Sequence, residues 1–228
     1  MIQDLTVKKA KVRLPIAESI RASGLRVQQQ LGFQLTKYSS SRKHRSLVEK
    51  STRKNVDISN IWNGGSVSTK SILSMDLEST KDANGLAVSI SNITNMALRL
   101  TVSNSAGLSH VSVHDVVGPL SQKSAISIKQ SSLRSLNISR VEFKSGGSVN
   151  VAKSNILEDL ALVEMAEISS LDITDSASAR VSIQDLASVT GDITIERHEL
   201  TGPQRSFDLD LEGSVIGGNV IIADVSGT

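Results

Sequence analysis

Three acidic residues near the C-terminus alternate with leucines and form the clearest candidate for enzymatic chemistry. Asp208, Asp210 and Glu212 are each separated by one leucine, so on a strand they would share one face at intervals of about 7 Å. Carboxylates at that spacing can hold a cation, or divide acid and base roles as in glycoside hydrolysis. Such alternation is also typical of a solvated outer sheet face, which is the role that we expect here.

Histidine is the other residue type that invites a chemical interpretation. His110 and His114 are the one close pair, but four residues of strand separate them by about 13 Å, too far for one metal ion to bridge. The chain has no cysteine, and it contains neither a glycine-rich phosphate-binding loop nor a Gly-x-Ser-x-Gly nucleophile motif. The sequence therefore predicts a protein that is not an enzyme and that holds no metal or cofactor. The alternative is a carbohydrate-active β-helix enzyme, or a polysaccharide-binding protein, that uses outward carboxylates.

A division of charge points to a polyanionic partner. Residues 1–54 contain 13 Lys or Arg against three acidic residues, a formal charge of +10, and the remainder carries −8, which together give the net +2. A cluster of cations attracts phosphate backbones through counterion release, and Phe33 and Tyr38 could stack on unpaired bases. The predicted nucleic-acid-binding residues are these two aromatics together with Lys8, Lys9, Lys11, Arg13, Arg42, Lys43, Arg45, Lys50, Arg53 and Lys54. RNA, DNA, lipid headgroups and an acidic protein surface remain open as partners, and so does an arm that folds back on an acidic body.

The element that positions all these residues is a short strand repeated along the chain. From residue 56 onward, pairs of apolar residues flank a single polar residue, as in Val181-Ser182-Ile183, about every 12 residues. This alternation indicates strands with one buried face, and two strands per unit of about 24 residues indicate a solenoid. We therefore predict a mainly β protein, a parallel β-helix (β-solenoid) of about six turns over residues 56–228. An aromatic content of only 2% suits its narrow aliphatic interior better than the alternative, an antiparallel β-sandwich or jelly-roll.

Residues 1–55 have a different pattern and are predicted to form a basic, partly helical N-terminal arm. Pro15 precedes apolar residues with a rough helical period, including Ile16, Ile20 and Leu25, and proline is tolerated in the first turn of a helix. We therefore expect an amphipathic helix from about Pro15 to Gln30, followed by a polar linker.

Location and assembly follow from what the sequence lacks and from the expected fold. Without cysteine, a secretory signal or an apolar run long enough to span a bilayer, an intracellular, cytoplasmic protein is expected. The open ends of a β-solenoid can recruit further chains, so self-association into a homo-oligomer is expected. The sequence thus predicts a non-enzymatic structural protein whose β scaffold self-associates and contacts single-stranded nucleic acid through its basic arm. That layout resembles viral structural and movement-type proteins only by analogy.

Overall fold

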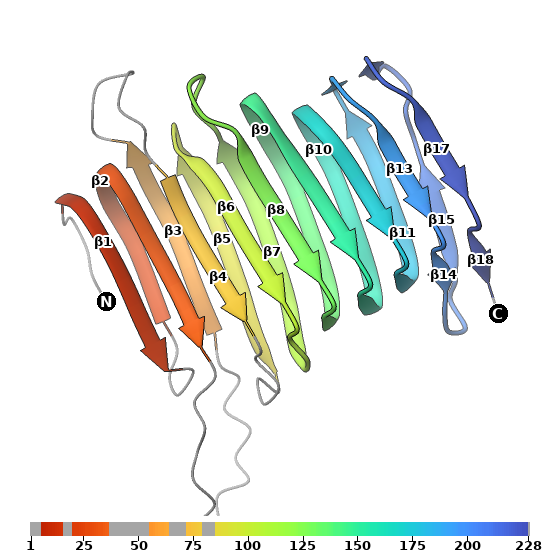
Figure 1. Ribbon diagram of the computed structural model, residues 1–228, viewed down its shortest axis with the longest axis horizontal. Helices are drawn as coiled ribbons and strands as arrows, with labels where there is room; N and C mark the ends of the chain where they lie inside the picture. Colours follow the sequence, from red (N-terminus) through yellow and green to blue (C-terminus); the bar gives the residue numbers. More distant parts are fainter. Residues whose placement is uncertain (1–5, 16–19, 37–54, 64–71, 79–84, 228) are drawn as a thin grey trace, which may run out of the picture.

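A computed structural model describes the backbone of residues 6–15, 20–36, 55–63, 72–78 and 85–227, and the side chains of residues 56–62, 72–77 and 85–227. Strands follow one another through this part of the chain, with no helix among them (Figure 1). Their bounds are β1 Thr6–Pro15, β2 Ile20–Thr36, β3 Asn55–Asn63, β4 Ile72–Glu78, β5 Leu86–Thr94, β6 Ala97–Ser103, β7 Leu108–Val117, β8 Ser124–Lys129, β9 Ser132–Ala152, β10 Asn155–Thr174, β11 Ala177–Leu186, β12 Ser188–Val189, β13 Ile193–Glu196, β14 Glu199–Leu200, β15 Ser206–Leu209, β16 Val215–Ile216, β17 Val220–Ala223 and β18 Ser226–Gly227.

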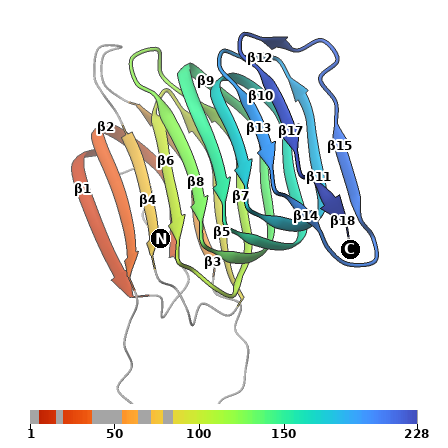
Figure 2. The ribbon, with the colours of Figure 1, turned by 45° about the vertical axis from the view of Figure 1, so that its right-hand side comes forward.

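The strands coil into a solenoid, in which each strand pairs with the strand one full turn later. Val111 of β7 lies opposite Leu136 of β9, which lies opposite Leu160 of β10. Every pairing between the described strands is parallel, and the stack has about six turns (Figure 2). The predicted parallel β-helix is therefore confirmed, and the antiparallel sandwich or jelly-roll is excluded. We call one full turn a coil, and equivalent positions in successive coils a column.

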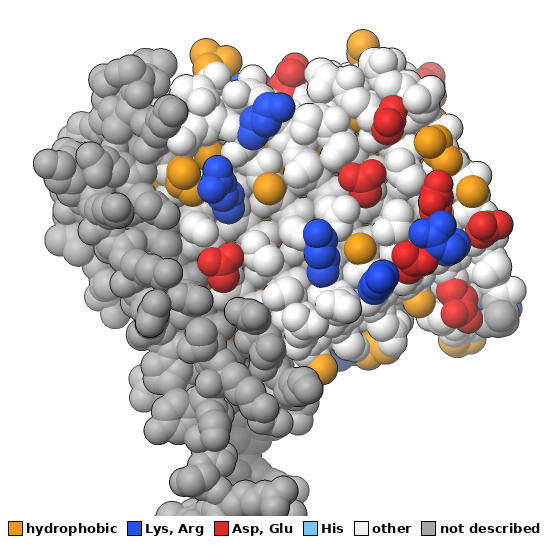
Figure 3. Space-filling model, viewed as in Figure 1, with side chains coloured by type: hydrophobic (Ala, Val, Ile, Leu, Met, Phe, Trp, Pro, Cys, Tyr) orange, Lys and Arg blue, Asp and Glu red, His pale blue; other side chains and the backbone are white. Residues whose placement is uncertain are grey.

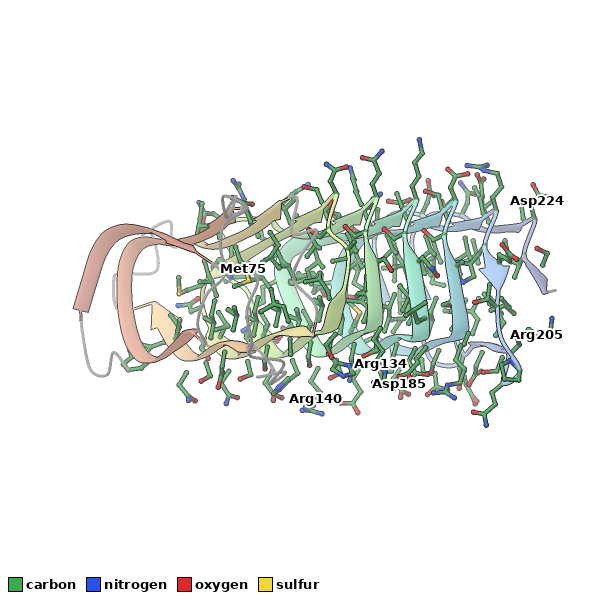
Figure 4. The ribbon with its side chains drawn as sticks, turned by 90° about the horizontal axis from the view of Figure 1, so that it is seen from below. Met75, Arg134, Arg140, Asp185, Arg205 and Asp224 are labelled. Atoms are coloured by element: carbon green, nitrogen blue, oxygen red, sulfur yellow. The ribbon has the colours of Figure 1, made fainter. Side chains whose placement is uncertain are left out.

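Aliphatic columns fill the interior of the solenoid. One column consists of Met75, Leu100, Ile126, Val149, Leu171 and Ile193, all of them almost completely buried. Figure 4 shows Met75 inside the coil, between the walls of the sheet. Strand alternation produces this column, because every second residue points inward and burial of each such side chain contributes about 1.5–3 kcal/mol. Phe143 is the one fully buried aromatic side chain in the part of the chain that the structure describes.

Single residues in the left-handed region bend the chain at two corners of each coil. One corner column consists of Asn60, Asn92, Asp115, Arg140, Glu164 and Asp185, and the other of Asn104, Gln130, Lys153, Asp175, Arg197 and Asp224, with φ between 49° and 55°. Non-glycine residues adopt this region at a cost, and Asn and Asp adopt it most readily. These side chains are exposed or half-exposed, so each corner presents a polar column to solvent.

A buried ladder of serines runs along the second corner. Ser105, Ser131, Ser154 and Ser176 each follow a left-handed residue and are almost fully buried. The N–H of each of the first three donates to the hydroxyl of the next serine, at 3.2–3.3 Å. Each hydroxyl in turn donates to the carbonyl two residues earlier in its own coil. The ladder satisfies backbone groups that the bend removes from the sheet, as buried polar groups require.

The helix predicted from Pro15 to Gln30 is wrong, because the structure has strand β2 over Ile20–Thr36. Its backbone pairs in parallel with β3 and β4, and β1 pairs with β2. The register places Ala22 and Leu25 level with Ile58 and Ile61. Ile20 and Leu25 lie five residues apart because one strand step of two, to Ala22, is followed by one corner step of three, as Asn60 shows between Ile58 and Ile61. The boundary of an N-terminal domain at residue 55 stays a prediction.

Candidate functional site: the two charged ends of the solenoid

Charge is graded along the solenoid axis. Residues 85–154 contain seven Lys or Arg and two acidic residues, whereas residues 155–227 contain three and 14, giving formal charges of +5 and −11. Residues 1–84 contribute +8. Because the described coils stack in chain order, the change of charge between residues 85–154 and 155–227 becomes a division in space. On the face in Figure 3, acidic side chains gather toward the C-terminal end, and most Lys and Arg lie over the middle.

The last coil leaves apolar side chains uncovered. Val220, Ile221 and Ile222 of β17 are 43%, 39% and 47% exposed. Val220 and Ile222 pair with Ile193 and Ile195, which are fully buried. The two interior columns therefore continue to the C-terminal edge of the solenoid and are open to solvent there. Figure 2 shows β17 in this last coil. Exposed apolar patches of this kind commonly mark interaction sites.

Two acidic residues, Asp192 and Asp224, lie beside this open edge. Asp192 accepts hydrogen bonds at Oδ1 from the backbone N–H and the side-chain amide of Asn219, at 2.7 and 3.3 Å. Asp224 follows β17 at a corner, and Figure 4 shows it at the C-terminal end of the molecule. Gly217 and Gly218 bring the chain against the preceding coil, where a Cβ at Gly218 would lie 2.5 Å from the carbonyl oxygen of Gly191. The edge is thus rigidly built, acidic and partly apolar.

Ion pairs connect neighbouring coils along the sides. The Arg140 guanidinium donates to Asp115 at 2.7 Å and, with His114, holds the pKa of that carboxyl well below its ordinary value. Arg197 lowers the pKa of Asp175 in the same way from the next coil. Exposed pairs of this type contribute only about 0–1 kcal/mol each. Each of these pairs joins two neighbouring coils and is neutral as a unit.

A shallow depression at the second corner is lined by charges of both signs. Lys153, Asp175, Arg197 and Glu199 border it, and Arg197 and Asp175 are already paired with each other. In the described residues, no group of three or more His, Asp or Glu side chains is placed to hold a metal ion. Ser154 and Ser176 also line the depression, but both are almost fully buried and their hydroxyls donate to the carbonyls of Ala152 and Thr174.

The predicted row of three carboxylates does not form. Asp208 lies on β15 and accepts a hydrogen bond from the Gln184 side chain, but the strand ends at Leu209. Asp210 Oδ1 instead accepts the backbone N–H of Glu212 at 2.9 Å. The row fails because this side-chain-to-backbone bond forms a turn in place of further strand.

The described histidines have separate partners. His110 Nδ1 lies 2.6 Å from Ser135 Oγ, and His114 Nδ1 lies 2.8 Å from Asp115 Oδ2. His198 is completely buried at the end of the serine ladder. Its Nε2 lies 2.9 Å from Ser178 Oγ and its Nδ1 has no hydrogen-bond partner, and burial lowers its pKa. Sequence reasoning missed this histidine, although it follows Ser176 at the spacing of one coil.

The predicted nucleic-acid-binding residues divide into two groups. Lys8, Lys9, Lys11 and Arg13 lie on β1, the first strand of the stack. Phe33 lies on β2 in register with the buried Met75, and its role in base stacking stays a prediction. The others lie outside the described residues: Tyr38, Arg42, Lys43, Arg45, Lys50, Arg53 and Lys54.

Comparison with protein-family models, curated proteins and solved structures finds no match to this chain. Within the described part of the chain, no helix is long and apolar enough to cross a lipid bilayer. The interpretation of function therefore rests on the geometry and charge described above.

Proposed function

We propose that this protein is a non-enzymatic structural protein, a self-associating β scaffold that contacts single-stranded nucleic acid through its basic N-terminal region. The observation that carries the proposal is the grading of charge, from +8 in residues 1–84 to −11 in residues 155–227. A concentrated basic end attracts phosphates from a distance, and the acidic end keeps nucleic acid away from the other pole of the scaffold. Recognition of this kind is electrostatic and independent of base sequence.

The non-enzymatic part of the proposal is supported by the candidate chemical groups themselves. The Ser178–His198 pair is completely buried, so it offers no access to a substrate. Asp208 and Asp210 are each engaged in a hydrogen bond and do not converge on a common point. Replacing Asp208, Asp210 and Glu212 by Asn or Gln is expected to leave every biological activity unchanged. A glycosidase or lyase rate that the replacements abolish would refute this part.

Filter-binding titration of a single-stranded RNA at several salt concentrations tests the nucleic-acid contact. In the full chain, Arg42, Lys43 and Arg45 are replaced together by Gln. Because each phosphate contact on a single strand contributes about 0.7 to the slope of log K against log salt, the slope is expected to fall by about 2. A matched variant replaces the exposed body residues Lys123, Lys129 and Lys144 by Gln.

The matched variant has the same net charge, so it separates local contact from overall charge. It is expected to retain the slope of the unmodified chain. Equal losses in both variants would mean that only net charge matters, and would refute a binding site in the N-terminal region. Absence of RNA binding by the unmodified chain would refute the nucleic-acid partner altogether.

A further inference from the structure

We propose that copies of this chain stack head to tail, with the open edge of the last coil of one copy pairing with the β1 edge of the next. This inference rests on the self-association in the proposed function and names the two surfaces involved. Three independent features of the molecule support it: the continuity of the interior columns, the direction of the strands and the distribution of charge.

The interior columns that are open at the C-terminal edge have their first members on β1. The register pairs Val12 with Phe33 and Leu14 with Leu35, and these lead through Met75 and Leu77 down the stack to Val220 and Ile222. A second copy placed with β1 over β17 would continue both columns with aliphatic residues. The exposed apolar surface of Val220 and Ile222 would then be covered as it is at every earlier coil.

Strand direction favours the same arrangement. Among the described strands, β17 pairs with β13 and β1 pairs with β2, so within the described part of the chain each of these two strands has one edge that faces no other strand. Head-to-tail stacking relates copies by translation and rotation about the axis, so it extends the parallel pairing found throughout the solenoid. Unpaired edges of this kind are templates for pairing with another chain.

Charge distinguishes head-to-tail stacking from a symmetric contact. A contact between two C-terminal ends would bring two acidic surfaces together, because residues 155–227 of each copy carry a formal charge of −11. Asp192 and Asp224 lie close to the edge. The β1 edge instead brings Lys8, Lys9, Lys11 and Arg13. Complementary charge speeds association and disfavours the wrong pairing. Because a head-to-tail contact uses two different surfaces and need not close, the product is an open filament.

Two variants of the full chain each disable one surface. The tail variant carries Val220→Lys and Ile222→Lys, at side chains that are already exposed, and the head variant carries Lys8→Glu, Lys9→Glu, Lys11→Glu and Arg13→Glu. The control variant carries Leu120→Lys and Leu157→Lys, which add the same charge as the tail variant at residues 72% and 57% exposed on other parts of the surface. Far-ultraviolet circular dichroism verifies that each variant keeps its β structure.

Sedimentation velocity without nucleic acid gives the result. The unmodified chain and the control variant are expected to form polymers that grow with protein concentration. Polymer mass is expected to decrease between about 0.1 M and about 1 M salt, where the Debye length falls from about 10 Å to about 3 Å. The tail and head variants are each expected to be monomers, and their equimolar mixture a dimer and nothing larger, because only one productive contact is left.

Other outcomes would overturn the proposal. A head variant that dimerises alone would indicate contact between two C-terminal ends, and a tail variant that polymerises like the unmodified chain would show that β17 is not the surface. A polymer mass that increases with salt concentration would exclude attraction between opposite charges as a cause of the stacking. A monomeric unmodified chain would refute self-association itself, whereas loss of RNA binding with intact polymers would refute only the nucleic-acid partner.

Discussion

Removal of one hydroxyl from the serine ladder tests how the second corner of the solenoid is stabilised. The Ser154 hydroxyl accepts the N–H of Ser131 at 3.3 Å and donates to the carbonyl of Ala152 at 2.9 Å. Replacement Ser154→Ala leaves the backbone of Ser154 itself free to donate to Ser176. It also removes the acceptor of the Ser131 N–H in the preceding coil. Ser131 is only 4% exposed, so water cannot replace the lost hydroxyl.

The expected loss follows from these two bonds. A buried donor that loses its partner costs about 1–3 kcal/mol in the free energy of unfolding. The lost bond to Ala152 adds little, because that carbonyl also accepts the N–H of Gln130 at 3.0 Å. We therefore expect Ser154→Ala to destabilise the chain by about 1–3 kcal/mol. Ser127→Ala serves as the control, since this serine lies on the outer face of β8 between Ile126 and Ile128 and its loss is expected to change stability by less than about 0.5 kcal/mol.

Urea denaturation followed by circular dichroism measures both variants, with the midpoint and the slope fitted together. Hydrogen exchange supplies a local readout, because the Ser131 amide is expected to exchange faster in Ser154→Ala and at its normal rate in Ser127→Ala. The reasoning would be refuted by equal midpoints for the two variants, or by unchanged protection of the Ser131 amide. A changed slope would mean that coils unfold separately, as solenoids can, and the comparison would then be made on the exchange rate.

Three further changes test the packing, the corners and the buried histidine. Gly147→Ala would place a Cβ 2.1 Å from Cδ2 of the buried Phe143, so we expect the free energy of unfolding to fall by about 1–3 kcal/mol. Phe143→Leu in the same chain is expected to recover part of this loss, as measured by urea midpoints. If the losses of the two single variants were additive, the clash would be refuted. Gln130→Gly relieves a φ of 49° and is expected to stabilise by about 0.5–1 kcal/mol, whereas Ser127→Gly, within a strand, is expected to destabilise by about as much. Because burial lowers the pKa of His198, the unfolded chain binds a proton at this imidazole more readily than the folded chain does. The contribution of neutral His198 to stability is therefore fully present above about pH 6.5. Below that pH it falls by up to about 1.4 kcal/mol per pH unit until the folded pKa is reached. His198→Gln is expected to flatten that decline below about pH 6.5, and an unchanged pH profile would contradict the role of His198.

The alternating pairs were predictable because strand geometry leaves few alternatives. In Val149-Asn150-Val151 the two valines are fully buried and the asparagine is half-buried, as a period of two requires. The same rule holds for the pairs from Met75/Leu77 to Ile193/Ile195. It does not hold for Val220 and Ile222, which have the pattern of buried residues but lie at an edge. Sequence periodicity reports which face a side chain occupies, and it contains no information on whether a following coil covers that face.

The serine ladder was not predictable in the same way. The alternation predicts an outward position for a serine between two apolar residues, and Ser127 and Ser182 agree with it. Ser131 and Ser154 point inward at a corner, where the left-handed residue before each of them shifts the alternation. The spacing along the ladder varies between 26, 23 and 22 residues, so no fixed repeat marks it.

Corners also explain why the N-terminal strand had the appearance of a helix. At each first corner, one left-handed residue lengthens the step between inward residues from two to three, as from Ile90 to Ile93 across Asn92. Apolar residues spaced by steps of two and three approximate the period of a helix. In β2, Gly24 lies level with Asn60, between the register pairs Ser23–Ser59 and Leu25–Ile61. Gly24 therefore stands where the later coils have a left-handed residue, and glycine adopts that conformation without strain.

The separation of charge along the solenoid axis can be recognised only once the fold is known. The excess of cations in residues 1–54 is visible in the sequence, but the change from +5 in residues 85–154 to −11 in residues 155–227 lies inside a body with a net charge of −8. In a globular domain, neighbours in sequence scatter over the surface, and such a change has no direction. In a solenoid, position in the chain is position along the axis, because each coil contacts mainly the coils before and after it. The seven cations of residues 85–154 therefore lie over the middle coils and the 14 acidic residues of 155–227 over the last coils, and the uncovered β17 edge lies at this acidic end.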